Sequence, residues 1–568
     1  MHERMRAGDI TRGFNDQKQR TQVKAQVKTQ VQKPPTSLLS WLAFLSALLC
    51  LLYVLSQPAA AQSMAFKQAV AEAASKDRDL AGFYQDTAYT PVWTRDDAVG
   101  QARRQALFRA LENVDMHGLP EARYDTQGLM TTLRDAQSTR DLGFAEVAMS
   151  QMFLRLSRDM QTGLLTPIDV DENIKREVPY RDRKTLLTQF QSGDPVAYFR
   201  TLAPQTNEYA RLMKTKLQLE TRVANGGWGE PVPSKSLKPG ATGPSVVALR
   251  NRLVRMGFLQ RSVTQSYDRD IEAAVRSFQT LHGLEPDGAA NQATMKAINV
   301  SAADRLKSVI VAMERERWLN LPGGKGERHI LVNLTDFSAR IMDKDNETFR
   351  TRAVIGMHKD GRRSPEFSDE MEHMVINPTW HVPRSIAVKE YLPKLRANPN
   401  AVSHLRVVNS RGQTVSRGSV NFAAYSARTF PFALKQPPSP RNALGLVKFM
   451  FPNKYNIYLH DTPHKDLFSR ETRAYSHGCI RLADPFDFAY EILSKQEADP
   501  KAAFHRTLDT GRETYVHLDT HVPVHIIYRT AVSDAKGVVR YRSDVYGRDA
   551  KIWSALERAG VSLNAVQG

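Results

Sequence analysis

Hydrophobic residues recur at helical spacing in the first half of the chain and at alternate positions further on. Between residues 62 and 235, apolar side chains repeat every three or four positions, and Pro and Gly interrupt these runs. From about residue 320 to 535, segments such as HILVNL and VPVHIIY alternate apolar and polar positions, as half-buried strands do. The pattern predicts a helical domain over 62–235 and a β-rich domain over 320–535.

A third predicted unit, over 237–300, lies between these two regions. A stretch rich in Pro and Gly, 226–243, reads as a linker before it. Apolar stripes then predict helices over 243–259 and 268–284, and a shorter one follows at 293–298. Three short amphipathic helices in succession predict a small bundle.

The strand pattern of the β-rich domain lapses over a long internal segment. Between Trp380 and Gly445 the chain passes through HVPRSIAVKEYLPKL and a polar stretch that ends in KQPPSPRNALG. Connections of this length are usually lids or binding loops. We expect a capping insertion at about 384–445 that covers an active site, and a C-terminal extension over 536–568. The fold class is therefore a multidomain α+β protein.

The N-terminal part predicts export. Residues 1–37 form a polar, basic tail without apolar periodicity, which indicates a disordered cytoplasmic segment. The uncharged run over 38–55 is followed by Ala59, Ala60 and Ala61, so 38–61 fits either a cleaved signal peptide or a membrane anchor. Both interpretations place everything after residue 61 outside the inner membrane, in the periplasm.

Composition and charge narrow the function further. The net charge of +19 is spread along the chain rather than gathered into a basic helix or an aromatic RNA-binding motif, which argues against nucleic acid as a partner. The chain has two cysteines, Cys50 in the apolar run and Cys479. The exported part therefore holds one cysteine and no intrachain disulfide, although its compartment is oxidising.

Cys479 has the surroundings of a nucleophile. It lies in SHGCIRL, and His460 ends the segment KYNIYLH, 19 residues upstream. A working cysteine needs a nearby base, and a strand over KYNIYLH would turn Tyr458 and His460 to the same polar side. Gly478 gives backbone freedom for aiming N–H groups at an oxyanion. Arg481 supplies a cation that would favour a thiolate and could bind a substrate carboxylate.

The other histidines leave two questions open. His477 fits support of the site or contact with substrate, and a purely structural role is an alternative. His460, His464, His477 and Cys479 are also zinc-ligand types, but their spacings match no standard zinc pattern. We therefore predict no metal and no other cofactor.

The motifs resemble two known families. Residues 237–300 resemble the peptidoglycan-binding domain of cell-wall enzymes, through matching positions such as Gly243, Phe278 and Asp287. The chain also resembles the L,D-transpeptidase family, whose motif pattern of a histidine followed by a cysteine motif is met by His460 and by Ser476-His477-Gly478-Cys479-Ile480-Arg481. Further segments that extend this resemblance to its large Gram-negative type are Arg363-Ser364-Pro365, Asn377 to Pro383, Ser385-Ile386-Ala387, Lys448 to Asn453, and Tyr546-Gly547-Arg548-Asp549.

The resemblance implies a cysteine acyltransferase that forms 3-3 crosslinks between peptidoglycan stem peptides. It implies that Cys479 forms a thioester with a tetrapeptide stem, that His460 is the base and that the Asp461 carbonyl orients it. The N–H groups of Gly478 and Cys479 would bind the oxyanion. Residues expected to support the site or contact substrate are His477, Arg481, Ser476 and Tyr458. Inhibition by carbapenems is expected on the same ground.

Other functions remain open on the sequence. The same cysteine could pass its acyl group to water, as a carboxypeptidase or endopeptidase does, or attach proteins to the wall. A non-catalytic wall-binding scaffold is the remaining alternative. The acceptor cannot be read from the motifs, because the capping insertion would shape the path by which it enters.

Overall fold

The computed structural model describes residues 63–359, 361–533 and 537–563. Contacts divide the chain into two compact units, Met1–Met64 and Ala65–Gly568, and every named element lies in the second. The predicted tail over 1–37 and the predicted signal or anchor over 38–61 fall outside the described residues. Among the residues that are described, no helix has both the length and the apolar character needed to span a membrane.

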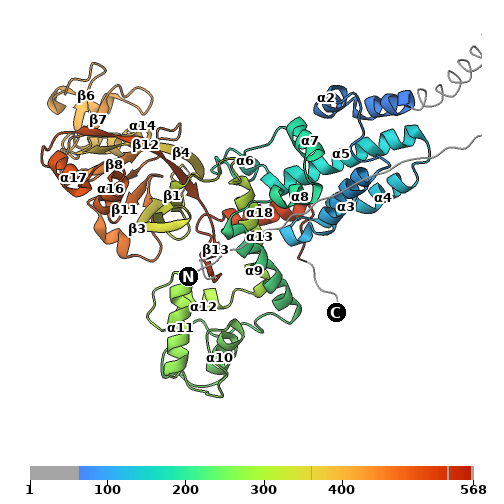
Figure 1. Ribbon diagram of the computed structural model, residues 1–568. Helices are drawn as coiled ribbons and strands as arrows, with labels where there is room; N and C mark the ends of the chain where they lie inside the picture. Colours follow the sequence, from blue (N-terminus) through green and yellow to red (C-terminus); the bar gives the residue numbers. More distant parts are fainter. Residues whose placement is uncertain (1–62, 360, 534–536, 564–568) are drawn as a thin grey trace, which may run out of the picture. The chain divides into compact units, whose positions relative to one another are not determined.

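The predicted helical domain consists of short helices around one apolar core (Figure 1). Side chains of Asp or Ser at the first position cap several of these helices, including a capping box in which Ser138 and Asp141 satisfy each other's backbone N–H groups. The helices are α2 (Arg78–Asp86), α3 (Ala98–Glu112), α4 (Thr126–Arg134), α5 (Thr139–Thr162), α6 (Pro167–Val170), α7 (Arg183–Ser192), α8 (Pro195–Leu202) and α9 (Asn207–Ala224).

The three helices of the small bundle form where the apolar stripes predict them. They are α10 (Pro244–Met256), α11 (Arg269–His282) and α12 (Gln292–Ile298). Val246, Leu249 and Phe278 lie in their shared core. The segment interpreted as a linker also contributes, because Val232 is buried in this core and its N–H donates to the Asn299 side chain (2.9 Å). It is therefore packed against the bundle.

Helix α13 (Ala302–Trp318) follows the bundle, and the sequence pattern did not predict it. Its last turns hold four consecutive charged residues, Glu314 to Arg317, and all four are buried. Glu314 pairs with Arg317 (2.7 Å), and Glu316 pairs with Arg529, which follows the last long strand of the β-rich domain. Buried ion pairs with partners distant in sequence therefore hold this helix.

The β-rich domain is built on one large sheet. Within the described residues its strand order is β10-β3-β11-β9-β8-β4-β12-β1-β2, and β2 also pairs with β3, so that eight of the strands close into a ring. The strands are β1 (Arg328–Asn333), β2 (Ser338–Asp343), β3 (Asn346–Gly356), β4 (Phe367–Ile376), β8 (Val447–Met450), β9 (Leu459–His460), β10 (Ala474–Ser476), β11 (Ile480–Leu482) and β12 (Thr514–Ile527).

The apolar residues of the alternating strands fill the inside of this sheet. Ile330 and Val332 of β1 and Val524 and Ile526 of β12 are buried together with residues of helix α16 (Pro485–Leu493). Helix α17 (Pro500–Leu508) packs beside α16. Asp484 precedes α16, but its carboxylate does not cap the helix and accepts a hydrogen bond from Thr351 Oγ1 (2.8 Å) of β3.

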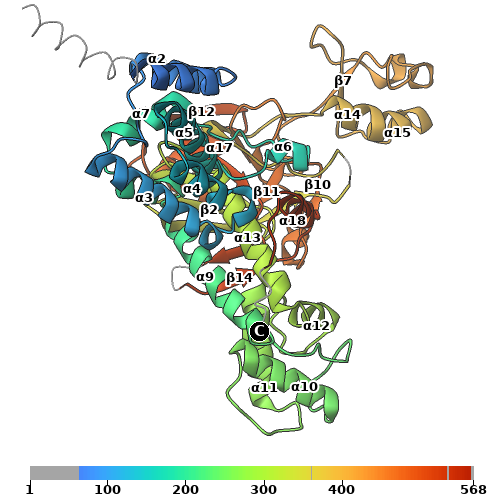
Figure 2. The ribbon, with the colours of Figure 1, turned by 90° about the vertical axis from the view of Figure 1, so that its right-hand side faces the viewer.

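The segment predicted as a capping insertion has a small apolar core of its own. Its elements gather into one lobe in which β7 lies near α14 and α15 (Figure 2). They are β5 (Trp380–His381), α14 (Arg384–Ile386), the π-helical turn η3 (Ala387–Tyr391), α15 (Leu392–Ala397), β6 (Arg406–Val408), the turns η4 (Arg417–Ser419) and η5 (Phe422–Ala424), and β7 (Ala433–Gln436). We call this lobe the cap.

The chain ends in elements that return to the helical part. They are the hairpin of β13 (Ala531–Ser533) and β14 (Val539–Tyr541), and helix α18 (Arg548–Arg558), which contacts α13. Arg548 and Asp549, at the start of α18, are buried. The predicted C-terminal extension therefore packs into the fold. Together these parts confirm the predicted multidomain α+β fold class.

Candidate active site

Two short parallel strands bring the predicted nucleophile and base to the same side of the sheet. In the pairing of β9 with β11, Arg481 lies opposite His460, and the Ile480 N–H donates to the Tyr458 carbonyl (3.1 Å). Paired residues of parallel strands point their side chains the same way, and so do residues two positions apart. Cys479, Tyr458, His460 and Arg481 therefore share one face.

The His460 imidazole is held in the form that can accept a proton. The ring is buried, and its Nδ1 lies 2.5 Å from the Asp461 carbonyl oxygen. Because a carbonyl only accepts, Nδ1 carries the proton and Nε2 is left as the basic atom. Burial, and to a lesser extent the charge of Arg481, lowers the pKa of His460 to about 3. The imidazole is neutral at pH 7.

Asp461 is fixed by its carboxylate while its carbonyl orients His460. The carboxylate accepts hydrogen bonds from the N–H groups of Leu446 (2.9 Å) and Thr462 (2.7 Å) and an ion pair from Lys465 (2.8 Å). Gly445 lies so close that a Cβ there would stand 2.2 Å from this carboxylate, and its φ of +62° also favours glycine. A carboxylate anchored at so many points keeps the residue's own carbonyl in place.

The Cys479 thiol is protonated at rest. Its side chain is half-buried, and Sγ lies 3.5 Å from the Asn456 carbonyl oxygen, to which the S–H donates. Burial raises the pKa of the Cys479 thiol to about 11, while Arg481 acts in the opposite direction. The sequence suggested that this cation would favour a thiolate. Its effect has that sign, but burial outweighs it.

The loop before the nucleophile uses its own polar groups to hold its shape. Ser476 Oγ donates to the Cys479 carbonyl (2.6 Å) and accepts from the Gly478 N–H (3.1 Å). Ser476 is only 2% exposed, and its hydroxyl supports the loop. The contact with substrate that we expected for it stays a prediction. Gly478 has a φ of +123°, which other residues rarely adopt.

This loop leaves the backbone N–H of the nucleophile available to an oxyanion. The Gly478 N–H, expected to share that role, is already bound to Ser476 Oγ. In contrast, the Cys479 N–H makes no hydrogen bond with any residue that the structure describes. An uncommitted N–H on the nucleophilic residue itself is the usual donor to the oxygen of a tetrahedral intermediate.

His477 binds the cap. Its Nε2 lies 2.7 Å from Glu390 Oε1, and the same carboxylate pairs with Arg362 (2.6 Å). Glu390 lies in η3, within the cap. We call these three residues the cap clasp. Sequence reasoning left the role of His477 open and gave no signal for Glu390.

Tyr458 and Arg481 complete the surroundings of the thiol. Tyr458 packs against both the core of the sheet and the core of the cap. Burial and then the neighbouring Cys479 raise the pKa of its hydroxyl well above the usual value. The Arg481 guanidinium is half-buried, and within the part of the chain described it has no hydrogen-bond or ion-pair partner. It is a cation available to an anionic ligand.

The arrangement contains the groups that acyl transfer by a cysteine would need. A thiol, a neutral imidazole oriented by a carbonyl and a free N–H donor supply the nucleophile, the base and the oxyanion contact that acyl transfer requires. No three His, Cys, Asp or Glu side chains cluster as metal ligands would in the described ranges.

Family models match three parts of the chain. Residues 327–517 match the L,D-transpeptidase catalytic domain, residues 78–215 match the scaffold domain, and residues 242–298 match the "Putative peptidoglycan binding domain". The chain therefore contains three regions that are similar, in order, to a scaffold domain, a peptidoglycan-binding domain and an L,D-transpeptidase catalytic domain. His460 and Cys479 lie within the range that matches the catalytic-domain model.

The individual proteins that match this chain have low sequence identity to it. A "Putative L,D-transpeptidase" of Haemophilus influenzae is 28% identical over 225 residues, which cover 39% of this chain and 45% of that protein, so the match spans less than half the relative's length. Two solved L,D-transpeptidase structures also align. One, from Xylanimonas cellulosilytica, covers 52% of this chain and 100% of its own at 14% identity and a TM-score of 0.15. The other, from Stackebrandtia nassauensis, covers 52% and 96% at 15% identity and a TM-score of 0.20. Scores this low establish no similarity of overall structure.

Proposed function

We propose that this protein is an L,D-transpeptidase that forms 3-3 crosslinks in peptidoglycan through a thioester on Cys479. The observation that carries the proposal is the shared face of β9 and β11, which holds the thiol, the neutral His460 imidazole and a free cation together. The match of residues 327–517 to the L,D-transpeptidase catalytic domain supports the same reaction class.

In the first half of the reaction, Cys479 Sγ attacks the carbonyl carbon of the third residue of a tetrapeptide stem. His460 Nε2 takes the thiol proton as the C–S bond forms, and the Cys479 N–H binds the developing oxyanion. The intermediate collapses with cleavage of the C–N bond, and the imidazolium gives its proton to the departing amine of D-alanine. The stem is then held as a thioester.

In the second half, an amine from a neighbouring stem attacks the thioester carbonyl. His460 accepts the proton of that amine and returns it to the leaving sulfur, which restores the resting thiol. One amide bond is thereby exchanged for another in two steps. Because a neutral thiol and a neutral imidazole are the resting forms, the proton moves only as each bond forms.

We assign to Arg481 the role of binding a carboxylate of the substrate. Its guanidinium lies on the face of the nucleophile and has no partner in the described protein, so a stem-peptide carboxylate can bind there without displacing an ion pair. Tyr458 lies between the sheet and the cap, where it can line the donor's path.

Export and wall attachment fit the same function. Scaffold, peptidoglycan-binding and catalytic domains are those of a protein that acts on the cell wall, outside the cytoplasm. We place the protein in the periplasm, released or anchored through residues 38–61. The net charge of +19 would favour contact with anionic wall polymers.

Incubation of the full-length protein with tetrapeptide muropeptides tests the proposal. Mass analysis of products should show crosslinked dimers together with free D-alanine. Cys479→Ser, which changes one atom, should abolish both products while the circular dichroism spectrum stays unchanged. Shortened monomers alone would indicate water as the acceptor, and products formed by Cys479→Ser would contradict the assignment of the nucleophile.

A further inference from the structure

Ser364 joins the nucleophile loop to the sheet. It lies in the connection between β3 and β4 and is completely buried. Its hydroxyl donates to the Gly478 carbonyl (2.6 Å) and accepts from the Gly356 N–H (2.9 Å) at the end of β3. The Gly478 carbonyl belongs to the peptide whose nitrogen is the free N–H of Cys479. A contact at one end of that planar unit therefore fixes the direction of the donor at the other.

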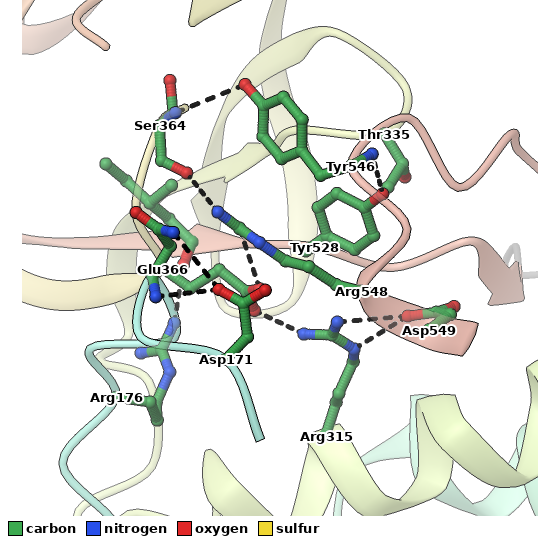
Figure 3. A network of polar contacts seen from close by, with 12 residues as sticks. Asp171, Arg176, Arg315, Thr335, Ser364, Glu366, Tyr528, Tyr546, Arg548 and Asp549 are labelled. Atoms are coloured by element: carbon green, nitrogen blue, oxygen red, sulfur yellow. Dashed lines mark hydrogen bonds and ion pairs between the residues drawn. The ribbon is translucent and has the colours of Figure 1, made fainter. Parts of the chain in front are cut away.

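The backbone of Ser364 is held in turn by the C-terminal segment. Its N–H donates to Tyr546 Oη (3.3 Å), and its carbonyl accepts from the Arg548 guanidinium (2.8 Å). The Tyr546 hydroxyl also donates to the Gly356 carbonyl. Figure 3 shows Tyr546 and Arg548 reaching Ser364 from the same direction. Each hydrogen-bonding group of Ser364 is therefore occupied.

A buried ion network keeps Arg548 in place. Glu366 bridges Arg548 (3.0 Å) and Arg315 of α13 (2.5 Å), and Arg315 also pairs with Asp549 (3.1 Å) (Figure 3). Charged groups in such a position must be paired, because an isolated buried charge is strongly unfavourable. The network therefore resists displacement of Arg548, and with it displacement of Ser364.

We propose that Ser364 is a positioning residue that aims the Cys479 N–H at the oxyanion, and that Tyr546 and Arg548 hold it in register. Tyr546 and Arg548 lie outside residues 327–517, which match the catalytic domain. The C-terminal segment is thus part of the catalytic machinery. The inference rests on the proposed acyl transfer by Cys479 and adds to it the residues that shape the oxyanion contact.

The proposal predicts different effects on two reactions of the Cys479 thiol, acylation and alkylation. Acylation by an activated ester such as p-nitrophenyl acetate passes through an oxyanion, releases p-nitrophenolate and leaves an acetyl thioester. Alkylation by iodoacetamide displaces iodide from carbon and forms no oxyanion. Loss of the Ser364 hydroxyl should therefore slow acylation selectively, because small misplacements of a catalytic group reduce rates steeply.

The experiment uses the full-length protein and follows the Cys479-containing peptide by mass, so that Cys50 does not interfere. We expect Ser364→Ala to slow acylation about 10- to 100-fold and to change alkylation at pH 9 by less than about threefold. Ser364→Thr keeps the hydroxyl and should restore acylation. Ser338→Ala is the matched control, because Ser338 is also buried in this domain but bonds Asp336 and Arg340.

The outcomes distinguish the inference from the proposed function. Equal slowing of acylation and alkylation by Ser364→Ala, or unchanged acylation, would overturn the positioning role and leave Cys479 as the nucleophile. Failure of Cys479 to react with either reagent in the unmodified protein would overturn both.

The C-terminal segment is tested by a double-mutant cycle. Tyr546→Phe removes one hydroxyl and should slow acylation in the same selective way. If Tyr546 acts through Ser364, the variant that combines Tyr546→Phe with Ser364→Ala should acylate about as slowly as Ser364→Ala alone. If the rate reductions caused by Tyr546→Phe and Ser364→Ala multiply in the combined variant, Tyr546 does not act through Ser364. Arg548→Lys, whose amine cannot span both Glu366 and the Ser364 carbonyl, gives an independent second cycle.

Discussion

At the scale of single residues, the site combines an acid and a base that are both uncharged at rest. Burial raises the pKa of Cys479 to about 11 and lowers the pKa of His460 to about 3. A preformed thiolate and imidazolium pair would need the opposite order. In the proposed mechanism the two side chains therefore transfer a proton during attack, and the neutral pair is the reactive state.

The first prediction concerns pH. Protonation of His460 removes the base, and because its pKa is lowered, that loss occurs at lower pH than for an ordinary histidine. We expect kcat/KM to be nearly constant from about pH 5.5 to about 8.5. Initial rates with a muropeptide donor, with folding checked by circular dichroism at each pH, measure this. An acid limb centred near the ordinary histidine pKa would contradict it.

At the scale of elements, the cap clasp connects the nucleophile loop to the cap. Glu390 bonds both His477 and Arg362, and His477 is separated from Cys479 by one residue. The clasp residues are partly exposed, so the ion pairs contribute little to stability. Their consequence is local: they link the nucleophile loop to the cap.

The second prediction tests the clasp. Glu390→Gln should raise KM for a stem-peptide donor about 3- to 10-fold and change the melting temperature by less than about 2 °C, since exposed ion pairs contribute about 1 kcal/mol or less. Lys389→Gln, at the neighbouring exposed position, is the control and should change neither quantity. An unchanged KM in Glu390→Gln would show that the clasp does not shape the site.

Elements also show how far the sequence could predict the fold. Stripes of apolar residues correctly predicted α10 and α11, because these helices bury one face each. The strand expected over KYNIYLH is reduced to β9, since Asn456 has a φ of +55° and the Asn453 side chain accepts from the N–H groups of Tyr455 and Ile457 (3.1 Å each). Such local hydrogen bonds compete with a strand ladder.

Some residues of the candidate site could be predicted from the sequence, and others are revealed only by the fold. Cys479 and His460 could be predicted because each lies in a short contiguous motif and the two lie only 19 positions apart. Glu390 and Arg548 could not, because each acts through a fold contact with a residue distant in sequence. Helix α13 was not predicted, although its buried residues Leu306, Val309 and Met313 recur at helical spacing. The partners of its buried charges lie elsewhere in the chain, and the sequence pattern gives no signal for them.

At the scale of the whole molecule, α13 connects helical and β-rich parts through buried charges. Glu314 accepts hydrogen bonds from Arg317, from Trp318 Nε1 (3.2 Å) and from the Leu165 N–H (2.9 Å). Gly163 adopts a φ of +87°, and a Cβ there would stand 2.4 Å from the Glu314 carboxylate. Contacts place the described residues beyond residue 64 in one compact unit, and α13 packs on both its helical and its β-rich parts.

The third prediction follows from this network. Glu314→Ala leaves the Arg317 guanidinium buried without its carboxylate, and we expect the free energy of unfolding to fall by about 3–5 kcal/mol. Equilibrium denaturation in urea measures the change. Glu112→Ala, at an exposed position, is the control and should lie within about 0.5 kcal/mol of the unmodified protein. A loss below 1 kcal/mol for Glu314→Ala would contradict a structural role for the pair.

The most direct measurement of the central claim is the mass of the trapped acyl-enzyme. The full-length protein is mixed with a tetrapeptide muropeptide, quenched in acid and digested, and the Cys479 peptide is weighed. The account predicts a mass increase equal to the muropeptide without its terminal D-alanine, present in the unmodified protein and absent in His460→Gln. Crosslinked product formed with no adduct on Cys479, or an adduct confined to another residue, would contradict it.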